Sequence, residues 1–251
     1  MEMSFYVGSI GADNCLNKLD VVSNNLANVN NTGYKPKTAV FSELINYNLN
    51  DDIEAVTELQ AGAGMRVQRT YTPFEASAFQ ETRNKLNYAL GDRNTFFMVQ
   101  DVATGEITYT RDGDFHRGEI DGVFYLTTQN GKLVLDENEQ PIELIMPQIG
   151  EDGEAAAEGD ERVQAQPGIV TFNLPSRLLS IGDNEYVPSD EGVEPIPVEN
   201  PYLETGYLEG SGVNVADEYV KMIETQRAFS YALKMVETSD ETVQTVNSLR
   251  G

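Results

Sequence analysis

The chain begins with the hydrophobic pattern of a long helix. Polar residues separate the apolar positions of this pattern. The run Asn30-Asn31-Thr32-Gly33 follows the pattern. Asn and Gly tolerate the left-handed conformation that closes helices, so a helix end is expected there. Apolar or small side chains recur at alternating spacings of three and four residues, the rhythm of a coiled-coil seam, at Ala12, Cys15, Leu19, Val22, Leu26 and Val29.

The last forty residues show the same alternation. No Pro or Gly occurs between residues 215 and 249, so a single helix of roughly 50 Å is expected. Asn214, followed three residues later by Asp217, resembles a capping box at its start. The seam positions are Tyr219, Met222, Gln226, Phe229, Leu233, Val236, Asp240, Val243 and Asn247.

A narrow apolar stripe gives an isolated helix too little burial to be stable alone. We therefore expect the two terminal helices to pack antiparallel as a coiled-coil-like bundle and to present their remaining apolar surface to neighbouring subunits. A helical hairpin that closes the core of one monomer has the same stripe, and this alternative stays open at the level of the pattern.

The middle of the chain has the pattern of short β-strands, rich in β-branched and aromatic residues. The runs are Thr95–Val102, Glu106–Arg111, Val123–Thr128, Lys132–Asp136 and Ile169–Leu174. The hairpin signals that separate them are Gly105, Asp112-Gly113, Asp121-Gly122 and Asn130-Gly131.

These patterns predict an α+β fold in which an antiparallel β-rich domain is inserted between long N- and C-terminal helices. The expected divisions are an N-terminal assembly helix over residues 1–40, an extended connector over 41–84, the β-rich outer domain over 85–205, and a C-terminal assembly helix over 206–251.

Charge is distributed unevenly along the chain. The formal net charge is −24, and the two ends are nearly neutral, which leaves −21 for the middle. Glu151–Arg162 is expected to be a solvated acidic loop. Neither nucleic acid binding nor insertion into a membrane is expected, because the chain repels phosphates and has no sufficiently long apolar run. The first residues lack the pattern of a cleavable secretory signal.

Residues that could carry chemistry are scarce. His116 is the only histidine and Cys15 the only cysteine, too few for a zinc site, and no nucleophile elbow accompanies the histidine. Loops starting at Asp112 and Asp136 lack the Gly and Glu of a calcium-binding EF-hand. We expect no catalytic residue, no metal site and no cofactor, and an assembly protein rather than an enzyme.

Three motifs resemble those of bacterial flagellar rod and hook proteins, and they occur in the same order along the chain. Asp20–Lys35 reads DVVSNNLANVNNTGYK, and Tyr109–Phe115 reads YTRDGDF. Gly206–Asn214 reads GYLEGSGVN, and Met222–Phe229 reads MIETQRAF.

The resemblance implies a structural subunit of the flagellar basal-body rod. Such proteins polymerise through their terminal helices into a hollow tube that transmits torque and conducts exported subunits. Export through the flagellar type III apparatus would explain the missing signal, and the periplasmic rod would be the location. Expected partners are copies of the chain, other axial rod and hook proteins, and the rings around the rod. The length favours a rod protein over a hook protein, and the Gln226-Arg227 segment favours the distal over the proximal type.

The alternatives are a hook-type, cap or adaptor protein, or, in a different class, a secreted β-domain binding protein or hydrolase. The residues expected at the assembly interface come from both ends of the chain. They are Leu19, Val22, Asn24, Asn25, Leu26, Asn28, Val29, Gly33, Tyr34, Met222, Gln226, Arg227, Phe229, Leu233, Val236 and Val243.

Overall fold

The computed structural model describes residues 2–44, 47–48, 60–145, 162–190 and 192–250. The chain divides into two compact units. A helical unit contains residues 1–27, 37–72 and 214–251, and a β unit contains residues 28–36 and 73–213. Residues 151–161 of the expected acidic loop lie outside the described residues.

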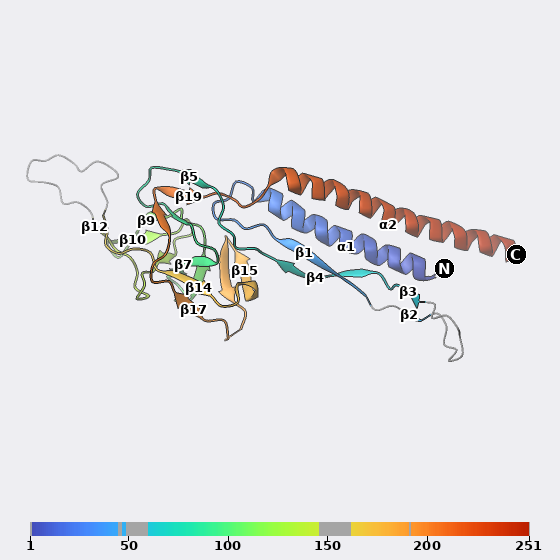
Figure 1. The fold of residues 1–251 in the computed structure, drawn as a ribbon, viewed down its shortest axis with the longest axis horizontal. Coiled ribbons are helices and arrows are strands. Elements are labelled where there is room, and N and C mark those ends of the chain that lie inside the picture. The colour runs from blue at the N-terminus through green and yellow to red at the C-terminus, as the bar shows by residue number, and fades with distance from the viewer. Residues whose placement is uncertain (1, 45–46, 49–59, 146–161, 191, 251) are drawn as a thin grey trace, which may run out of the picture. The chain divides into compact units, whose positions relative to one another are not determined.

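The helical unit is built from the two terminal helices and a β-ribbon. Helix α1 spans Glu2–Ala27 and helix α2 spans Val215–Arg250. They run antiparallel and side by side, since Ser4 contacts Ser239 near one end and Asn25 contacts Glu218 near the other (Figure 1). The ribbon pairs β1 (Thr38–Glu43) with β4 (Met65–Tyr71), and β2 (Tyr47–Asn48) pairs with β3 (Gln60–Ala61). Part of the predicted connector therefore belongs to this unit.

Helix α2 begins where local signals predict, whereas α1 ends at Ala27, before the predicted stop at Asn30. The α2 helix starts after Asn214, whose Oδ1 accepts hydrogen bonds from the backbone N–H groups of Ala216 (3.1 Å) and Asp217 (3.5 Å). The asparagine thus binds backbone donors that the first helical turn leaves without partners. After α1, the chain reverses through residues 28–33, and Gly33 has a positive φ of 66°.

One nine-stranded antiparallel sheet forms most of the β unit. Its order is β15-β16-β8-β7-β11-β10-β9, and β14 pairs with both β7 and β17. The strands are β7 (Thr95–Gln100), β8 (Ile107–Thr110), β9 (His116–Ile120), β10 (Val123–Thr127), β11 (Leu133–Val134), β14 (Ile169–Phe172), β15 (Leu178–Gly182), β16 (Glu185–Pro188) and β17 (Pro195–Pro197). The five strands predicted from the sequence are all present.

Three short strand pairs complete this unit, together with a 3₁₀ turn at Pro175–Arg177. The pairs are β5 (Phe79–Glu81) with β19 (Tyr207–Glu209), β6 (Tyr88–Leu90) with β18 (Leu203–Thr205), and β12 (Leu144–Ile145) with β13 (Arg162–Val163).

The hydrophobic core lies on both faces of β7. Side chains alternate between the faces of a strand, so Phe97 and Val99 join one buried cluster while Phe96 and Met98 join another. All four are at most 5% exposed, which explains the continuous apolar run in this strand.

Most of the predicted turns form hairpins, and one does not. Gly105 lies between β7 and β8, Asp121-Gly122 between β9 and β10, and Asn130-Gly131 between β10 and β11. The hairpin predicted at Asp112-Gly113 is wrong, because β8 pairs with β7 and β16 while β9 pairs with β10. Gly113 is required for space: a Cβ atom there would lie 1.8 Å from the carbonyl oxygen of Tyr88.

Candidate assembly site

Small residues form the contact between α1 and α2. A Cβ atom at Gly8 would lie 3.0 Å from Cγ2 of Val236 and 3.3 Å from the carbonyl oxygen of Ala232. A Cβ atom at Gly11 would lie 3.8 Å from that of Ala232. Helix separation depends on the side chains at the contact, so the glycines let the backbones approach closely. The intrachain contact consequently uses little of the apolar surface of α2.

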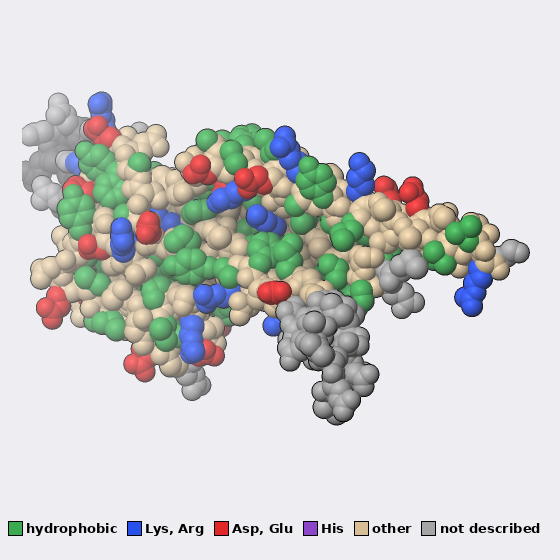
Figure 2. All heavy atoms as spheres, turned by 45° about the vertical axis from the view of Figure 1, so that its right-hand side comes forward, with side chains coloured by type: hydrophobic (Ala, Val, Ile, Leu, Met, Phe, Trp, Pro, Cys, Tyr) green, Lys and Arg blue, Asp and Glu red, His purple; other side chains and the backbone are tan. Residues whose placement is uncertain are grey.

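The large apolar side chains of α2 are instead exposed. The described residues of α2 that are buried are Glu218, Thr225 and Ser239. An ordinary surface helix buries its apolar side and exposes its polar side, and α2 does largely the reverse. Hydrophobic side chains lie at the surface where the helices run (Figure 2). The exposed ones on α2 are Val215, Tyr219, Val220, Ile223, Tyr231, Leu233, Met235, Val243, Val246 and Leu249.

The structure divides the candidate interface residues of α2 into two groups. Met222, Phe229 and Val236 are half-buried, whereas Gln226, Arg227, Leu233 and Val243 are exposed. The buried residues of α2, Glu218, Thr225 and Ser239, are separated by seven and fourteen residues. The 4–3 positions lie along one side of the helix, and burial within the chain covers only part of that side.

The candidates from the N-terminal motif lie in both units. In α1, Val22 and Asn25 are buried, Leu19 and Leu26 are half-buried, and Asn24 is exposed. The others follow the helix and belong to the β unit, where Gly33 and Tyr34 are buried and Asn28 and Val29 are half-buried.

Two buried asparagines form hydrogen bonds between α1 and other segments of the helical unit. The Asn25 side chain donates to the carbonyl oxygen of Lys37 and accepts from its N–H, both at 2.8 Å, and also donates to Glu218 Oε2 at 3.2 Å. Asn14 donates to the carbonyl oxygen of Met65 (2.8 Å) and accepts from the N–H of Val67 (2.9 Å). Each side-chain amide thus donates to a backbone carbonyl oxygen and accepts from a backbone N–H group. A neighbouring β-strand would make the same two kinds of hydrogen bond. Asn14 was not among the candidates, although it lies eleven residues, about three helical turns, before Asn25.

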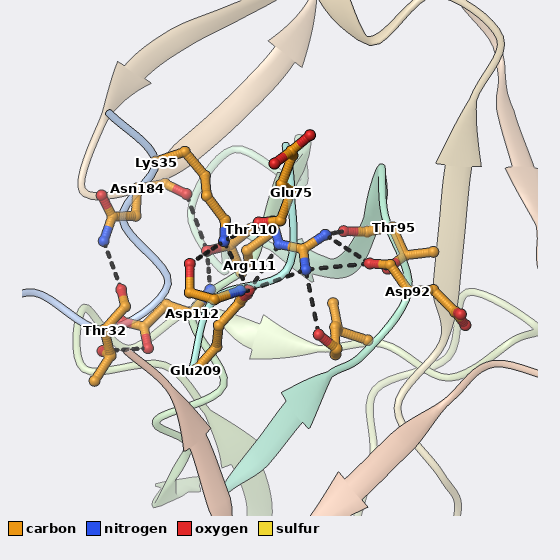
Figure 3. Close-up of polar contacts among 12 residues, drawn as sticks. Thr32, Lys35, Glu75, Asp92, Thr95, Thr110, Arg111, Asp112, Asn184 and Glu209 are labelled. Carbon is orange, nitrogen blue, oxygen red and sulfur yellow. Dashed lines mark hydrogen bonds and ion pairs between the residues drawn. The ribbon is translucent and has the colours of Figure 1, made fainter. Parts of the chain in front are cut away.

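An ion network lies fully buried within the β unit (Figure 3). Glu209 Oε1 is 2.7 Å from Lys35 Nζ, and Glu209 Oε2 is 3.0 Å from Arg111 Nε. The three residues are at most 1% exposed. Burial lowers the pKa of Lys35, and the carboxylate of Glu209 opposes that shift.

Backbone oxygens and the Ser77 hydroxyl accept further hydrogen bonds from the two cations. Lys35 Nζ donates to the carbonyl oxygen of Glu75 at 2.6 Å, and Arg111 donates to those of Thr95 at 2.9 Å and Asp92 at 3.2 Å. Such contacts are required because buried charges are stable only when paired and hydrogen-bonded.

The network joins the three sequence motifs. Lys35 ends the first motif, Arg111 lies in the second, and Glu209 lies in the third. None of the three was a candidate residue. The available signal was a basic side chain in each of the first two motifs and an acidic one in the third.

The turn around Gly33 fits closely against Arg111, which directly follows β8. Gly33 donates its N–H to the carbonyl oxygen of Glu209 at 2.8 Å. A Cβ atom at Gly33 would lie 2.6 Å from the carbonyl oxygen of Arg111. Thr32 Oγ1 donates to Asp112 Oδ1 at 2.6 Å, and Asn184 Nδ2 donates to the carbonyl oxygen of Thr32 at 2.8 Å.

Gly33→Ala is expected to lower the free energy of unfolding by about 2–4 kcal/mol, since it adds both a strained positive φ and a clash with backbone. Gly131→Ala is the matched control, with a φ of 78° and nothing within 4 Å of its Cβ position. It should cost only about 1–2 kcal/mol. Urea unfolding of the two variants measures the difference, and equal losses would contradict the close packing at Gly33.

Asp112 links stability to pH. Burial raises its pKa, although Thr32 and the N–H of Asp114 stabilise the ionised form. The folded chain then holds the proton more tightly than the unfolded chain, so the free energy of unfolding falls as pH rises through the raised pKa. Asp112→Asn, which keeps an acceptor oxygen, should raise the urea midpoint at neutral pH and remove this part of the pH dependence.

Asp101→Asn is the control, because it should change the free energy of unfolding in the opposite direction. Hydrogen bonds from the backbone N–H groups of Ala103 and Thr104 lower the pKa of Asp101. Ionised Asp101 therefore contributes stability above its unfolded pKa, which the variant loses. The free energy of unfolding of Asp112→Asn should depend on pH differently from that of the unmodified chain between about pH 4 and 7. The same dependence in both chains would contradict the raised pKa of Asp112.

The side chains considered above as possible catalytic or metal-binding groups contact backbone groups close to them in sequence. His116 is exposed, with Nδ1 3.1 Å from the carbonyl oxygen of Asp114. Asp136 Oδ1 accepts from the N–H groups of Asn138 and Gln140, which is a turn arrangement. Within the described ranges, no cluster of three or more His, Cys, Asp or Glu residues is placed to hold a metal ion, and no helix is long and apolar enough to cross a membrane.

Three family models match the chain in order. The first, flagella basal body rod protein, covers residues 5–35. The second, the flagellar hook protein FlgE/F/G D1 domain, covers residues 92–157. The third, flagellar basal body rod FlgEFG protein C-terminal, covers residues 204–249. They include the motifs that supply Lys35, Arg111 and Glu209.

Known relatives are similar over nearly the whole chain. The flagellar basal-body rod protein FlgG of Bacillus subtilis is 33% identical over 270 residues and covers 100% of both chains. FlgG of Buchnera aphidicola subsp. Schizaphis graminum is 32% identical over 262 residues, covering 98% of this chain and 99% of the relative. The rod protein FlgF of Caulobacter vibrioides is 31% identical, covering 96% and 95%. The chain therefore belongs to the flagellar basal-body rod and hook protein family.

Proposed function

We propose that this chain is a structural subunit of the flagellar basal-body rod, which polymerises through α1 and α2 into a hollow helical tube. The tube transmits torque and conducts exported subunits. The observation that carries the proposal is the outward face of α2, where large apolar side chains such as Ile223, Tyr231 and Leu233 are exposed.

An exposed apolar surface of this kind marks an interaction site. Small residues mediate the contact with α1, so this surface remains available for other chains. A head-to-tail contact that does not close produces a helical filament, which is the form that a rod requires. In the filament the paired helices become part of a larger coiled-coil-like bundle.

The partners in this proposal are copies of the chain, the axial rod and hook proteins above and below it, and the rings around the rod. The rod proteins among the relatives support this assignment. The subunit reaches the periplasmic rod through the flagellar export apparatus. A strongly acidic middle segment remains outside the near-neutral helical bundle, where water screens its charge.

Deleting the gene in the source bacterium tests the function. Cells without the chain should lack external hooks and filaments, because a tube that is missing a segment offers later subunits no base. Expression of the intact chain should restore them, and it should be detected in isolated basal bodies by mass spectrometry. Normal flagella in the deletion strain, or absence of the chain from the particles, would contradict the proposal.

A further inference from the structure

The outward sides of α1 and α2 carry opposite charges at the same spacing. On α1, exposed Asp13 and Asp20 are seven residues apart, and Leu16 between them is 45% exposed. On α2, exposed Arg227 and Lys234 are also seven residues apart. Tyr231 between them is 72% exposed. Seven residues make two helical turns, about 10 Å, so the two sets match in length.

The basic set points away from the contact between the helices. Each residue advances an α-helix by about 100°, so Arg227 lies about 200° around α2 from buried Thr225. Lys234 has the same relation to Ala232, the residue near Gly11 of α1. Both cations therefore face away from α1 of their own chain.

None of these four charges forms an ion pair within the described part of the chain; the ion pairs there do not include Asp13, Asp20, Arg227 or Lys234. The segment from residue 225 to 236 has no acidic side chain, and Glu224 and Glu237 flank it. The lysine between the two aspartates, Lys18, lies over the ring of Phe41 at 5.8 Å, on the ribbon side of α1.

A shallow groove on the surface of α2 lies beside Arg227. It is lined by Ile223, Gln226, Arg227, Ser230 and Tyr231, so apolar side chains border the basic set. The exposed Leu16 lies between the two aspartates of α1 in the same way. The two surfaces thus match in charge and spacing, and each carries an apolar side chain between its charges.

We infer that the Asp13–Asp20 side of α1 in one copy docks on the Arg227–Lys234 side of α2 in a second copy. The helices run antiparallel, with Asp13 opposite Lys234, Leu16 opposite Tyr231 and Asp20 opposite Arg227. This inference rests on the proposed function and names the contact by which neighbouring subunits join.

The docking register predicts how the copies are displaced. Within one chain, Ser4 lies opposite Ser239 and Asn25 lies opposite Glu218. Between copies, each residue of α1 lies opposite a residue of α2 that is four positions closer to the C-terminus than within one chain. This shift displaces the neighbouring copy by about 6 Å along the helix axis. A repeated displacement produces a rising helical array rather than a flat ring.

Cysteine cross-linking in assembled rods tests the register. The full chain carries Leu16→Cys and Tyr231→Cys in a Cys15→Ser background, and basal bodies isolated from the source bacterium are oxidised. A ladder of disulfide-linked multimers is expected. Each single-cysteine variant, and the pair Leu16→Cys with Ile223→Cys, should remain monomeric, because Ile223 is about 12 Å from Tyr231 along α2. A ladder in these controls, or none in the test pair, would overturn the register.

Charge reversal tests the pairing independently. The double change Arg227→Asp and Lys234→Asp should reduce the yield of rods at least about tenfold, because it places like charges together. Adding Asp13→Lys and Asp20→Lys should restore most of the yield. If the four-residue exchange fails to restore rods that the unmodified chain forms, the docking contact is wrong and the proposed function stands. If the unmodified chain is absent from rods, both are wrong.

Discussion

Replacing Glu209 by alanine is expected to lower the free energy of unfolding by about 3–5 kcal/mol, the usual cost of removing one partner from a buried ion pair. Glu209 is the carboxylate that faces both Lys35 and Arg111, and all three side chains are at most 1% exposed. Its loss leaves two buried cations with backbone oxygens and the Ser77 hydroxyl as their remaining partners. It also removes the acceptor for the N–H of Ser77 at 2.7 Å.

Urea unfolding followed by circular dichroism measures the effect, since the chain has no tryptophan. Glu81→Ala is the matched control: Glu81 lies on β5, the strand paired with β19, and forms an exposed ion pair with Arg83. That change should cost less than about 1 kcal/mol.

The Glu209→Ala deficit should become smaller as pH rises toward the ordinary pKa of lysine. Lys35 already has a lowered pKa and loses its proton more readily in the folded chain than in the unfolded one. Equal losses for the two glutamates would show that the buried network does not hold the motifs together.

Leu233→Asp is expected to prevent rod assembly while leaving the isolated chain folded. Leu233 is 43% exposed, so an aspartate there remains in water and should change the free energy of unfolding by no more than about 0.5 kcal/mol. In the proposed bundle the same carboxylate would be buried without a partner in every subunit.

Rod yield and urea midpoint together separate assembly from folding in this variant. Leu233→Met retains an apolar side chain of similar volume and should assemble normally. Val102→Asp introduces the same charge at an exposed valine in the β7–β8 turn, outside the bundle, and should also assemble. Normal rods from Leu233→Asp would remove Leu233 from the interface.

The sequence was sufficient to predict the elements whose signals are local. The cap of Asn214, the turn that contains Gly33, and the β-branched and aromatic strands depend on residues close in sequence, and they form where predicted. The Asp112-Gly113 signal failed because glycine serves two purposes. It can supply a tight turn, or it can admit a neighbouring backbone, as Gly113 does for Tyr88.

The faces of the helices and the buried network were less accessible from sequence. A 4–3 apolar stripe does not show which partner it faces, and the contact at Gly8 and Gly11 has no side chain for a hydrophobic pattern to detect. Arg111 and Glu209 are separated by 98 residues, so only the fold brings them together. Their distance to Lys35 is likewise set by tertiary packing.

The most direct test of the central claim is an electron cryo-microscopy structure of the isolated rod, at a resolution that traces side chains. We predict a helical tube whose inner wall contains α1 and α2 of this chain, with Ile223, Tyr231 and Leu233 buried between subunits and the β unit at larger radius. A rod in which the β unit lines the lumen, or in which the outward face of α2 remains in solvent, would contradict the account.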